Sequence, residues 1–215
     1  MHYKLVIFDF DGTLADSFPW FLSIINDVAD KYRFRRIDMT RLDELRSYSA
    51  RELISHLGVP MWKVPLIAGH MRRLMRENAG DISLVDGAEL VLETLSHQGI
   101  EMALVTSNTY HNVCAVLGTA NVERIRYLEC DTSVFGKKAR FSKLLKMTGI
   151  TPDEAICIGD EVRDAQAARA AGIDFIAVSW GYNDIDALKA HAPFKVLGSF
   201  DEFLGALHEG QRMKA

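Results

Sequence analysis

Short apolar runs recur along the chain and alternate with longer amphipathic segments. Each run is five residues long and rich in Val, Ile, Leu or Ala, and most show no strict apolar–polar alternation. Such runs are typical of parallel strands that are covered on both faces. We predict strands at 4–8, 101–105, 125–129, 155–159 and 175–179, with an edge strand at 194–199.

The segments between these runs have helical periodicity. We predict core helices at 86–99, 142–149 and 160–172, and a closing helix at 200–210. The first three end in glycine, a residue that favours the left-handed conformation that closes many helices. Strands that alternate with helices predict an α/β fold, a doubly wound parallel sheet.

One long stretch, residues 16–83, interrupts the alternation. It holds helical patterns at 19–34, 49–58 and 64–78 but no convincing strand. Ser49 precedes Glu52 by three residues, which is a capping-box pattern. We therefore expect a small all-α cap domain over 16–83, inserted after the first strand of an α/β core formed by 1–15 and 84–215.

Composition and charge narrow the class of protein. The 215-residue chain is 48% hydrophobic and 25% charged, with a net charge of −4, so its bulk charge does not favour nucleic acid. Its three cysteines lack the spacing of zinc ligands, which fits a reducing cytoplasm. No apolar run reaches the length of a membrane span. We expect a cytoplasmic protein, either a monomer or a homodimer, with no membrane partner.

Polar residues follow the predicted strands at the points where these strands end. Asp9 and Asp11 follow the first strand, Thr106 the second and Asp160 the fourth, with Asp164 one helical turn later. Open α/β sheets bind ligands beyond the carboxyl ends of their strands. Four carboxylates gathered there would repel one another strongly unless a cation or protons were present. Hard oxygen ligands favour Mg²⁺.

The segments that carry these residues resemble a known family. "DFDGTLADS", "LVTSN", the lysine of "VFGKKARF" and "IGDEVRDAQAARAAG" are similar, in this order, to the four motifs of the haloacid dehalogenase-like (HAD) hydrolases. The resemblance covers nearly the whole chain. The helical insertion is similar to the cap of phosphoglycolate phosphatase-like members, and "AVSWGY" resembles a loop that these phosphatases carry.

The resemblance implies a role for each acidic residue. Asp9 would be the nucleophile that forms an aspartyl-phosphate, and Asp11 the general acid that protonates the leaving oxygen. Mg²⁺ would be held by the Asp9 carboxylate, the Asp11 carbonyl and Asp160. Asp164 would complete the metal site through a bound water or through the motif lysine.

The resemblance also implies a set of phosphate-binding residues. Thr106 would donate its hydroxyl to a phosphate oxygen, and Lys137 would balance the phosphate charge. Family members often carry Lys-Pro where this chain has two lysines, so Lys138 stays an alternative. The turn residues Gly12 and Thr13 and the backbone amides of Ser107 and Asn108 would complete the substrate site.

The expected activity is hydrolysis of a small soluble phosphate monoester, of the phosphoglycolate type, with Mg²⁺ as cofactor. Asp11 argues against carbon–halogen cleavage, because the dehalogenases of this superfamily lack the second aspartate. A phosphomutase and a non-catalytic binding protein remain alternatives. The cap is expected to select the substrate, with Arg51 as the main candidate to grip a carboxylate or a second phosphate.

Overall fold

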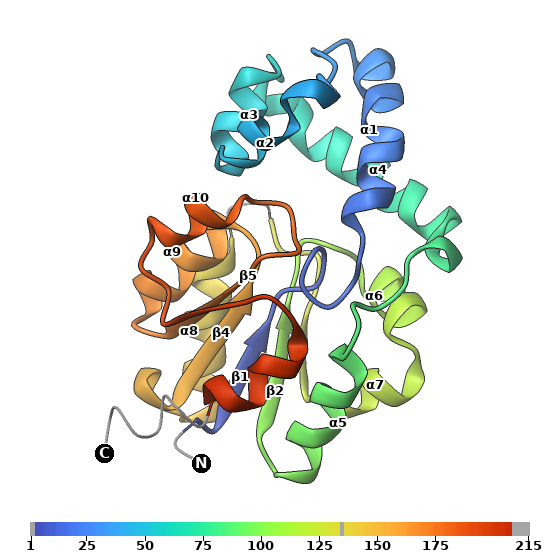
Figure 1. Ribbon diagram of the computed structural model, residues 1–215. Helices are drawn as coiled ribbons and strands as arrows, with labels where there is room; N and C mark the ends of the chain where they lie inside the picture. Colours follow the sequence, from blue (N-terminus) through green and yellow to red (C-terminus); the bar gives the residue numbers. More distant parts are fainter. Residues whose placement is uncertain (1–2, 134–135, 208–215) are drawn as a thin grey trace.

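The computed structural model describes residues 3–133 and 136–207 (Figure 1). An α/β core carries a smaller group of helices on one end, where the carboxyl ends of the strands lie. The outermost residues of the predicted core, 1–2 and 208–215, and Val134 and Phe135 of the lysine motif lie outside the described residues.

The core is a six-stranded parallel sheet in the order β3-β2-β1-β4-β5-β6. This arrangement confirms the predicted doubly wound α/β fold. The order reverses direction between β1 and β4, and Phe8 at the end of β1 pairs with both Leu104 and Ile158. The residues that follow these three strands are therefore neighbours at one edge. The strands are β1 (Leu5–Phe8), β2 (Glu101–Val105), β3 (Tyr127–Glu129), β4 (Ala155–Gly159), β5 (Asp174–Val178) and β6 (Lys195–Leu197).

Both faces of the sheet are covered, as its apolar strands predicted. Val6 and Phe8 of β1 pack in the core cluster shared with α5 (Ala88–His97), whereas Leu5 and Ile7 pack in the cluster on the opposite face. That opposite cluster includes residues of α8 (Lys137–Thr148) and α9 (Val162–Ala171). The rigid, fully buried β1 thus fixes the position of the loop that follows it.

Several core helices were not predicted, or began elsewhere than predicted. The predicted helix at 142–149 begins five residues earlier, at Lys137. The helices that the periodicity missed are α6 (Tyr110–Leu117), α7 (Thr119–Arg124) and α10 (Ile185–Lys189), with a 3-10 turn at Pro152–Glu154. They are short, so few turns are available to show an apolar stripe. The closing segment begins as a 3-10 turn, Phe200–Glu202, and is helical over 203–207; its last predicted residues, 208–210, are not described.

The inserted segment folds as helices around a small apolar cluster of its own, centred on Ile25, Ile37, Leu45 and Leu57. The predicted capping box is confirmed, with the Ser49 hydroxyl and the Glu52 carboxylate each accepting from the other residue's backbone amide. The helices are α1 (Phe18–Tyr32), α2 (Leu42–Arg46), α3 (Ala50–His56) and α4 (Val64–Glu77), with 3-10 turns at Met39–Arg41, Met61–Lys63 and Ala79–Asp81.

The chain enters and leaves this helical segment at one place. Ala15 forms an isolated antiparallel bridge with Leu84, and the Asp16 amide donates to the Ser83 carbonyl at 2.9 Å. The two segments that connect the helices to the sheet therefore lie side by side. We propose on this basis that 16–83 is the cap domain and that 1–15 and 84–215 form the core. No helix among the described residues is both long and apolar enough to cross a membrane.

Candidate active site

The loop after β1 places Asp9 and Asp11 at the carboxyl edge of the sheet. The Phe10 amide donates to Asp9 Oδ1 at 2.7 Å, which orients the carboxylate. Gly12 has a φ of +75°, and a Cβ there would lie 2.3 Å from Asp160 Oδ2. Glycine is required on both grounds, the left-handed backbone and the close approach to a neighbouring carboxylate.

Asp160 follows β4 and is fully buried. Its Oδ1 accepts from the Thr13 hydroxyl at 2.7 Å, and its Oδ2 accepts from the Tyr182 amide at 2.8 Å. A Cβ on Gly181 would come within 2.1 Å of the Asp160 side chain, so the loop after β5 can pass only because that residue is glycine. Loops after β1, β4 and β5 thus fix the orientation of this carboxylate.

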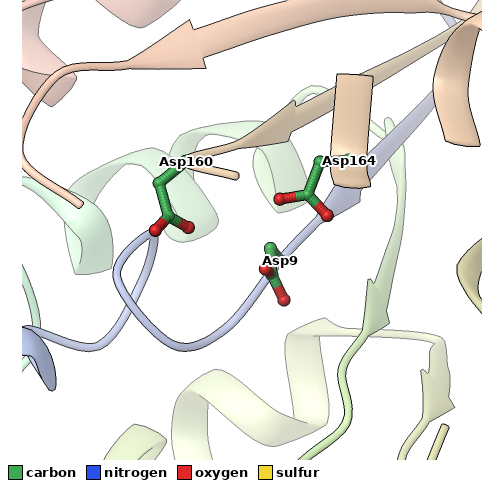
Figure 2. A group of neighbouring side chains, drawn as sticks. All are labelled: Asp9, Asp160 and Asp164. Atoms are coloured by element: carbon green, nitrogen blue, oxygen red, sulfur yellow. The ribbon is translucent and has the colours of Figure 1, made fainter. Parts of the chain in front are cut away.

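Three carboxylates meet where these loops converge (Figure 2). Ligand oxygens of Asp9, Asp160 and Asp164 all lie within 4.8 Å of one another, and all three side chains are buried. Burial, followed by the charge of Asp9, raises the pKa of Asp164 to about 7 and that of Asp160 well above its ordinary value. The cluster therefore favours either protons or a cation.

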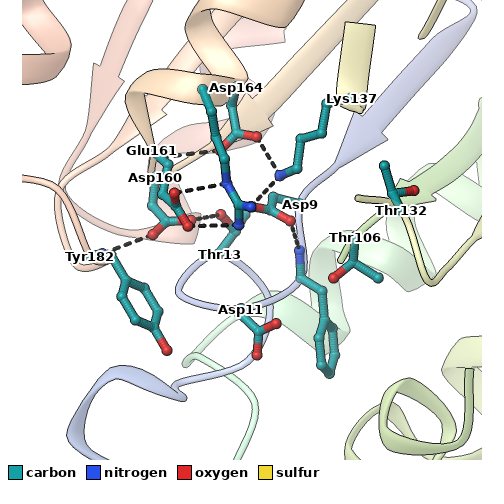
Figure 3. A network of polar contacts seen from close by, with 12 residues as sticks. Asp9, Asp11, Thr13, Thr106, Thr132, Lys137, Asp160, Glu161, Asp164 and Tyr182 are labelled. Carbon is teal, nitrogen blue, oxygen red and sulfur yellow. Dashed lines mark hydrogen bonds and ion pairs between the residues drawn. The ribbon is translucent and has the colours of Figure 1, made fainter. Parts of the chain in front are cut away.

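Lys137 supplies a positive charge to this cluster (Figure 3). Its side chain is 3% exposed; Nζ lies 2.5 Å from Asp9 Oδ2 and also contacts Asp164. Burial alone would lower the pKa of Lys137, but Asp164 and Asp9 outweigh it and raise the pKa above its ordinary value. Lys138, the alternative, is exposed. The structure thus brings Lys137 rather than Lys138 to the carboxylates.

Asp11 faces away from the triad and toward the loop after β2. Asn108 Nδ2 donates to both of its carboxylate oxygens, at 3.2 and 3.0 Å. Burial, followed by the Asp9 charge, raises the pKa of Asp11 to about 6, although the Asn108 hydrogen bonds oppose the shift. The two aspartates of the first motif therefore have different surroundings and different protonation behaviour.

Thr106 and Ser107 occupy the end of β2, beside the loop that carries Asp9. Thr106 is buried, and its hydroxyl accepts from the Asn108 amide at 2.9 Å (Figure 3). The Ser107 carbonyl accepts from Arg72 of the cap at 2.9 Å. The predicted phosphate-binding residues thus lie at the same edge as the carboxylates.

The geometry fits a small divalent cation. Asp9 Oδ2 is buried and forms an ion pair with the Lys137 ammonium. Three buried carboxylates whose oxygens lie this close together are a hard donor set of the kind that binds Mg²⁺ or Ca²⁺. The Asp11 carboxylate is not part of this cluster and is held by Asn108 instead.

Arg51 does not line the crevice beside Asp11. It lines a separate pocket of about 380 Å³ between α3 and the core, together with Lys137, Lys138 and Arg163. The crevice beside Asp11 is instead lined on the cap side by Trp20, Phe21, Ala68, Met71, Arg72 and Met75. Because the Arg51 pocket also contains Lys137, which contacts Asp9, the prediction that Arg51 grips the substrate stays a prediction.

Sequence reasoning overlooked two residues of the site, Arg163 and Tyr182. Arg163 lies between two motif aspartates, and its Nε is 2.8 Å from Glu161 Oε2. Its place within "GDEVRD" was a usable signal, because Arg163 lies in the first turn of α9, three residues after Asp160. Tyr182 lies in "AVSWGY"; its ring contacts Phe18 and Phe21 of the cap, with ring centroids 4.9 and 5.3 Å apart.

Comparison with known proteins agrees with the geometry. The family model "Haloacid dehalogenase-like hydrolase" matches residues 6–178. A phosphoglycolate phosphatase of Synechococcus elongatus is 29% identical, covering 97% of this chain and 99% of its own length. An N-acetylmuramic acid 6-phosphate phosphatase of Pseudomonas aeruginosa is 28% identical, covering 89% and 88%.

Solved structures share the fold. A putative phosphoglycolate phosphatase from Lactobacillus plantarum superimposes with a TM-score of 0.80 at 22% identity, covering 96% of this chain and 100% of its own. A predicted phosphatase from Clostridium acetobutylicum gives a TM-score of 0.79 at 21% identity, with coverage of 96% and 99%. The chain therefore belongs to the haloacid dehalogenase-like hydrolases, and within that family it is a phosphoric monoester hydrolase.

Proposed function

We propose that the protein is a Mg²⁺-dependent phosphatase that hydrolyses a small phosphate monoester through an aspartyl-phosphate on Asp9. One observation carries the proposal. The buried Asp9 carboxylate forms an ion pair with the Lys137 ammonium, and one of its oxygens lies within 4.8 Å of oxygens of Asp160 and Asp164.

Asp9 has the geometry of a nucleophile. The Phe10 amide fixes one carboxylate oxygen, and this leaves the other to attack phosphorus. Attack forms the Asp9–phosphorus bond and breaks the bond to the leaving oxygen. Lys137 stays beside Asp9 and offsets the charge that gathers on the phosphoryl oxygens.

Asp11 has the surroundings of a general acid and base. Its pKa of about 6 leaves a protonated fraction near neutral pH that can be delivered to the leaving oxygen. The resulting carboxylate then takes a proton from the water that hydrolyses the aspartyl-phosphate. Asn108 holds both oxygens of Asp11, so the same side chain is positioned for both steps.

The metal would be held by Asp9, Asp160 and the Asp11 carbonyl. Asp164 would lie next to the metal site, where its carboxylate contacts Lys137. A bound Mg²⁺ supplies positive charge that lets an anionic phosphate approach an anionic nucleophile. The Thr13 hydroxyl and the Tyr182 amide keep Asp160 in place for this role. Thr106 and the Ser107 and Asn108 amides would receive the phosphate oxygens.

The relatives supply the first substrates to examine. Several of them are phosphoglycolate phosphatases, whereas a relative of nearly equal identity acts on N-acetylmuramic acid 6-phosphate. Relatives at about 28% sequence identity thus act on different phosphate esters, so their names do not point to one leaving group for this chain. The mutase and binding-protein alternatives are not favoured, because the relatives compared above are phosphatases.

The test is phosphate release together with capture of the intermediate. Purified protein is mixed with p-nitrophenyl phosphate or 2-phosphoglycolate, with Mg²⁺ or with EDTA, and acid-quenched protein is digested to locate a phosphorylated aspartate. We expect Mg²⁺-dependent release and a labile phosphate on Asp9. The Asp9→Asn variant is the control and should show neither. Turnover in folded Asp9→Asn, or a phosphate on another residue, would refute the mechanism.

A further inference from the structure

The interior of the cap contains an apolar cavity. It has a volume of about 280 Å³ and lies among α1, α2, α3 and α4. Its walls include Phe34, Leu42, Leu53, Ile54 and Ile67. Four residues of the cap's own cluster are buried, and the other apolar side chains are only partly buried around this space. The helices of the cap thus surround an opening rather than a filled core.

The cavity adjoins the crevice where Asp11 lies. That crevice has a volume of about 190 Å³ and includes Asn108 among its walls. Both spaces share five lining residues, namely Phe21, Ala68, Glu161, Arg163 and Tyr182. The two spaces are therefore neighbours, and the contacting rings of Phe21 and Tyr182 lie on their shared wall.

The charged groups at the cavity are already engaged. Arg46 donates to the Gly181 and Tyr182 carbonyls at 2.8 and 3.1 Å. Glu161 and Arg163 pair with each other at 2.8 Å. All of these contacts lie at the end that faces the core, whereas the walls within the cap are mainly aliphatic and aromatic. A carboxylate or phosphate inside the cap would lose its hydration without gaining an ion-pair or hydrogen-bond partner, which would cost binding free energy.

We propose that the cap cavity receives the apolar part of the substrate's leaving group, so that the enzyme prefers phosphate monoesters of alkyl or aryl alcohols over those of small hydroxy acids. The inference rests on the proposed phosphatase function. Apolar cavities of about 150 Å³ can hold a benzene molecule, so this one has room for a phenyl ring or a short alkyl chain. Phosphoglycolate would leave it unfilled.

The test is a homologous series of alkyl phosphates. The alcohols of ethyl, butyl and hexyl phosphate differ little in acidity, so the intrinsic reactivity of the esters is nearly constant along the series. We expect kcat/KM to rise about threefold per methylene, so that hexyl phosphate is about 80-fold better than ethyl phosphate, and also at least about tenfold better than 2-phosphoglycolate. A flat series, or 2-phosphoglycolate as the best substrate, would overturn the proposal.

Two cavity-filling variants locate the effect. Leu53→Phe adds bulk within the cavity, away from the crevice, and Ala68→Leu adds it on the shared wall. Both should lower the hexyl-to-ethyl ratio of kcat/KM at least about fivefold. Ala120→Leu, on the exposed surface of α7, is the matched control and should keep the wild-type ratio. Folded variants that retain the chain-length preference would show that the cavity is not the binding site.

A binding measurement separates this inference from the proposed reaction. Hexylphosphonate and ethylphosphonate cannot be hydrolysed, and each is added with Mg²⁺ to the full chain while the melting temperature is followed. A larger rise with hexylphosphonate, abolished in Leu53→Phe, supports the cavity even if no ester is turned over. Equal shifts refute it even if p-nitrophenyl phosphate is hydrolysed, in which case the phosphatase assignment stands by itself.

Discussion

The carboxyl edge of the sheet and the interior of the cap are built in opposite ways. At the edge, the polar side chains of Asp9, Asp160 and Lys137 are buried, each 3% exposed or less. Their hydrogen bonds and ion pairs come from loops on rigid strands. In the cap, apolar side chains are half-buried around a cavity. The comparison indicates that the core fixes the chemistry, while the cap can accommodate different leaving groups.

Removing the general acid should have the largest effect. Asp11→Asn is expected to lower kcat on ethyl phosphate about 10³-fold, because the alkoxide leaves without a proton. The loss in the first step should be smaller for p-nitrophenyl phosphate, whose leaving group is stable as an anion. Rapid-quench measurement of phosphoenzyme on both esters checks the difference. Equal losses in the formation of phosphoenzyme would contradict the assignment of Asp11.

The adjacent lysines offer a matched pair. Lys137→Met removes a buried cation from between two carboxylates, and we expect about a 100-fold loss of kcat/KM and a destabilisation of about 3 kcal/mol. Lys138→Met changes an exposed residue and should leave kcat/KM within about threefold of the wild type. Denaturant unfolding and steady-state kinetics measure both. A larger loss of kcat/KM for Lys138→Met than for Lys137→Met would assign the phosphate site to Lys138.

The buried carboxylates of the site should make the stability of the fold depend on pH. The pKa values of Asp11 and Asp164 are raised to about 6 and about 7, above the ordinary 3.8. The folded state therefore binds more protons than the unfolded chain between these values, so the metal-free protein should lose stability as pH rises from about 4 to about 7.

Mg²⁺ should oppose this loss, since it binds the deprotonated carboxylates. At pH 7.5 we expect 10 mM Mg²⁺ to raise the melting temperature by about 5 °C, and less at pH 5. Asp160→Asn removes one carboxylate charge and serves as the control, with most of the rise lost. An equal rise in this variant would place the ion elsewhere.

Two cap arginines should give the smallest effects and distinguish the two sides of the cap. Arg46→Ala removes hydrogen bonds to the loop that positions Asp160, and it should lower kcat/KM about tenfold and stability by about 1–2 kcal/mol. Arg51→Ala should change kcat/KM by less than about threefold on ethyl phosphate, because this ester has no carboxylate or second phosphate for Arg51 to bind. A larger loss would show that Arg51 acts on the transferred phosphate or on the structure of the site.

Local sequence patterns are enough to predict the core and the order of its motifs. Strands buried on both faces produce uninterrupted apolar runs, and the residue after each run must lie at the carboxyl edge of a parallel sheet. Asp9, Asp160 and Thr106 could therefore be predicted to lie near one another from local patterns alone. The Ser49–Glu52 capping box was equally readable, since it is made within one turn of chain.

Packing between distant segments selects between neighbouring residues in the chain and between the two sides of a helix. Lys137 and Lys138 are adjacent residues of the same type, so the sequence does not distinguish them. The orientation of α8 against the sheet buries the side chain of Lys137 and exposes that of Lys138. Arg51 faces the other pocket because of how α3 docks, and the cap cavity exists because four helices leave space that no single helical pattern records. Local periodicity specifies which face of an element is apolar; what that face meets depends on contacts between residues far apart in the chain.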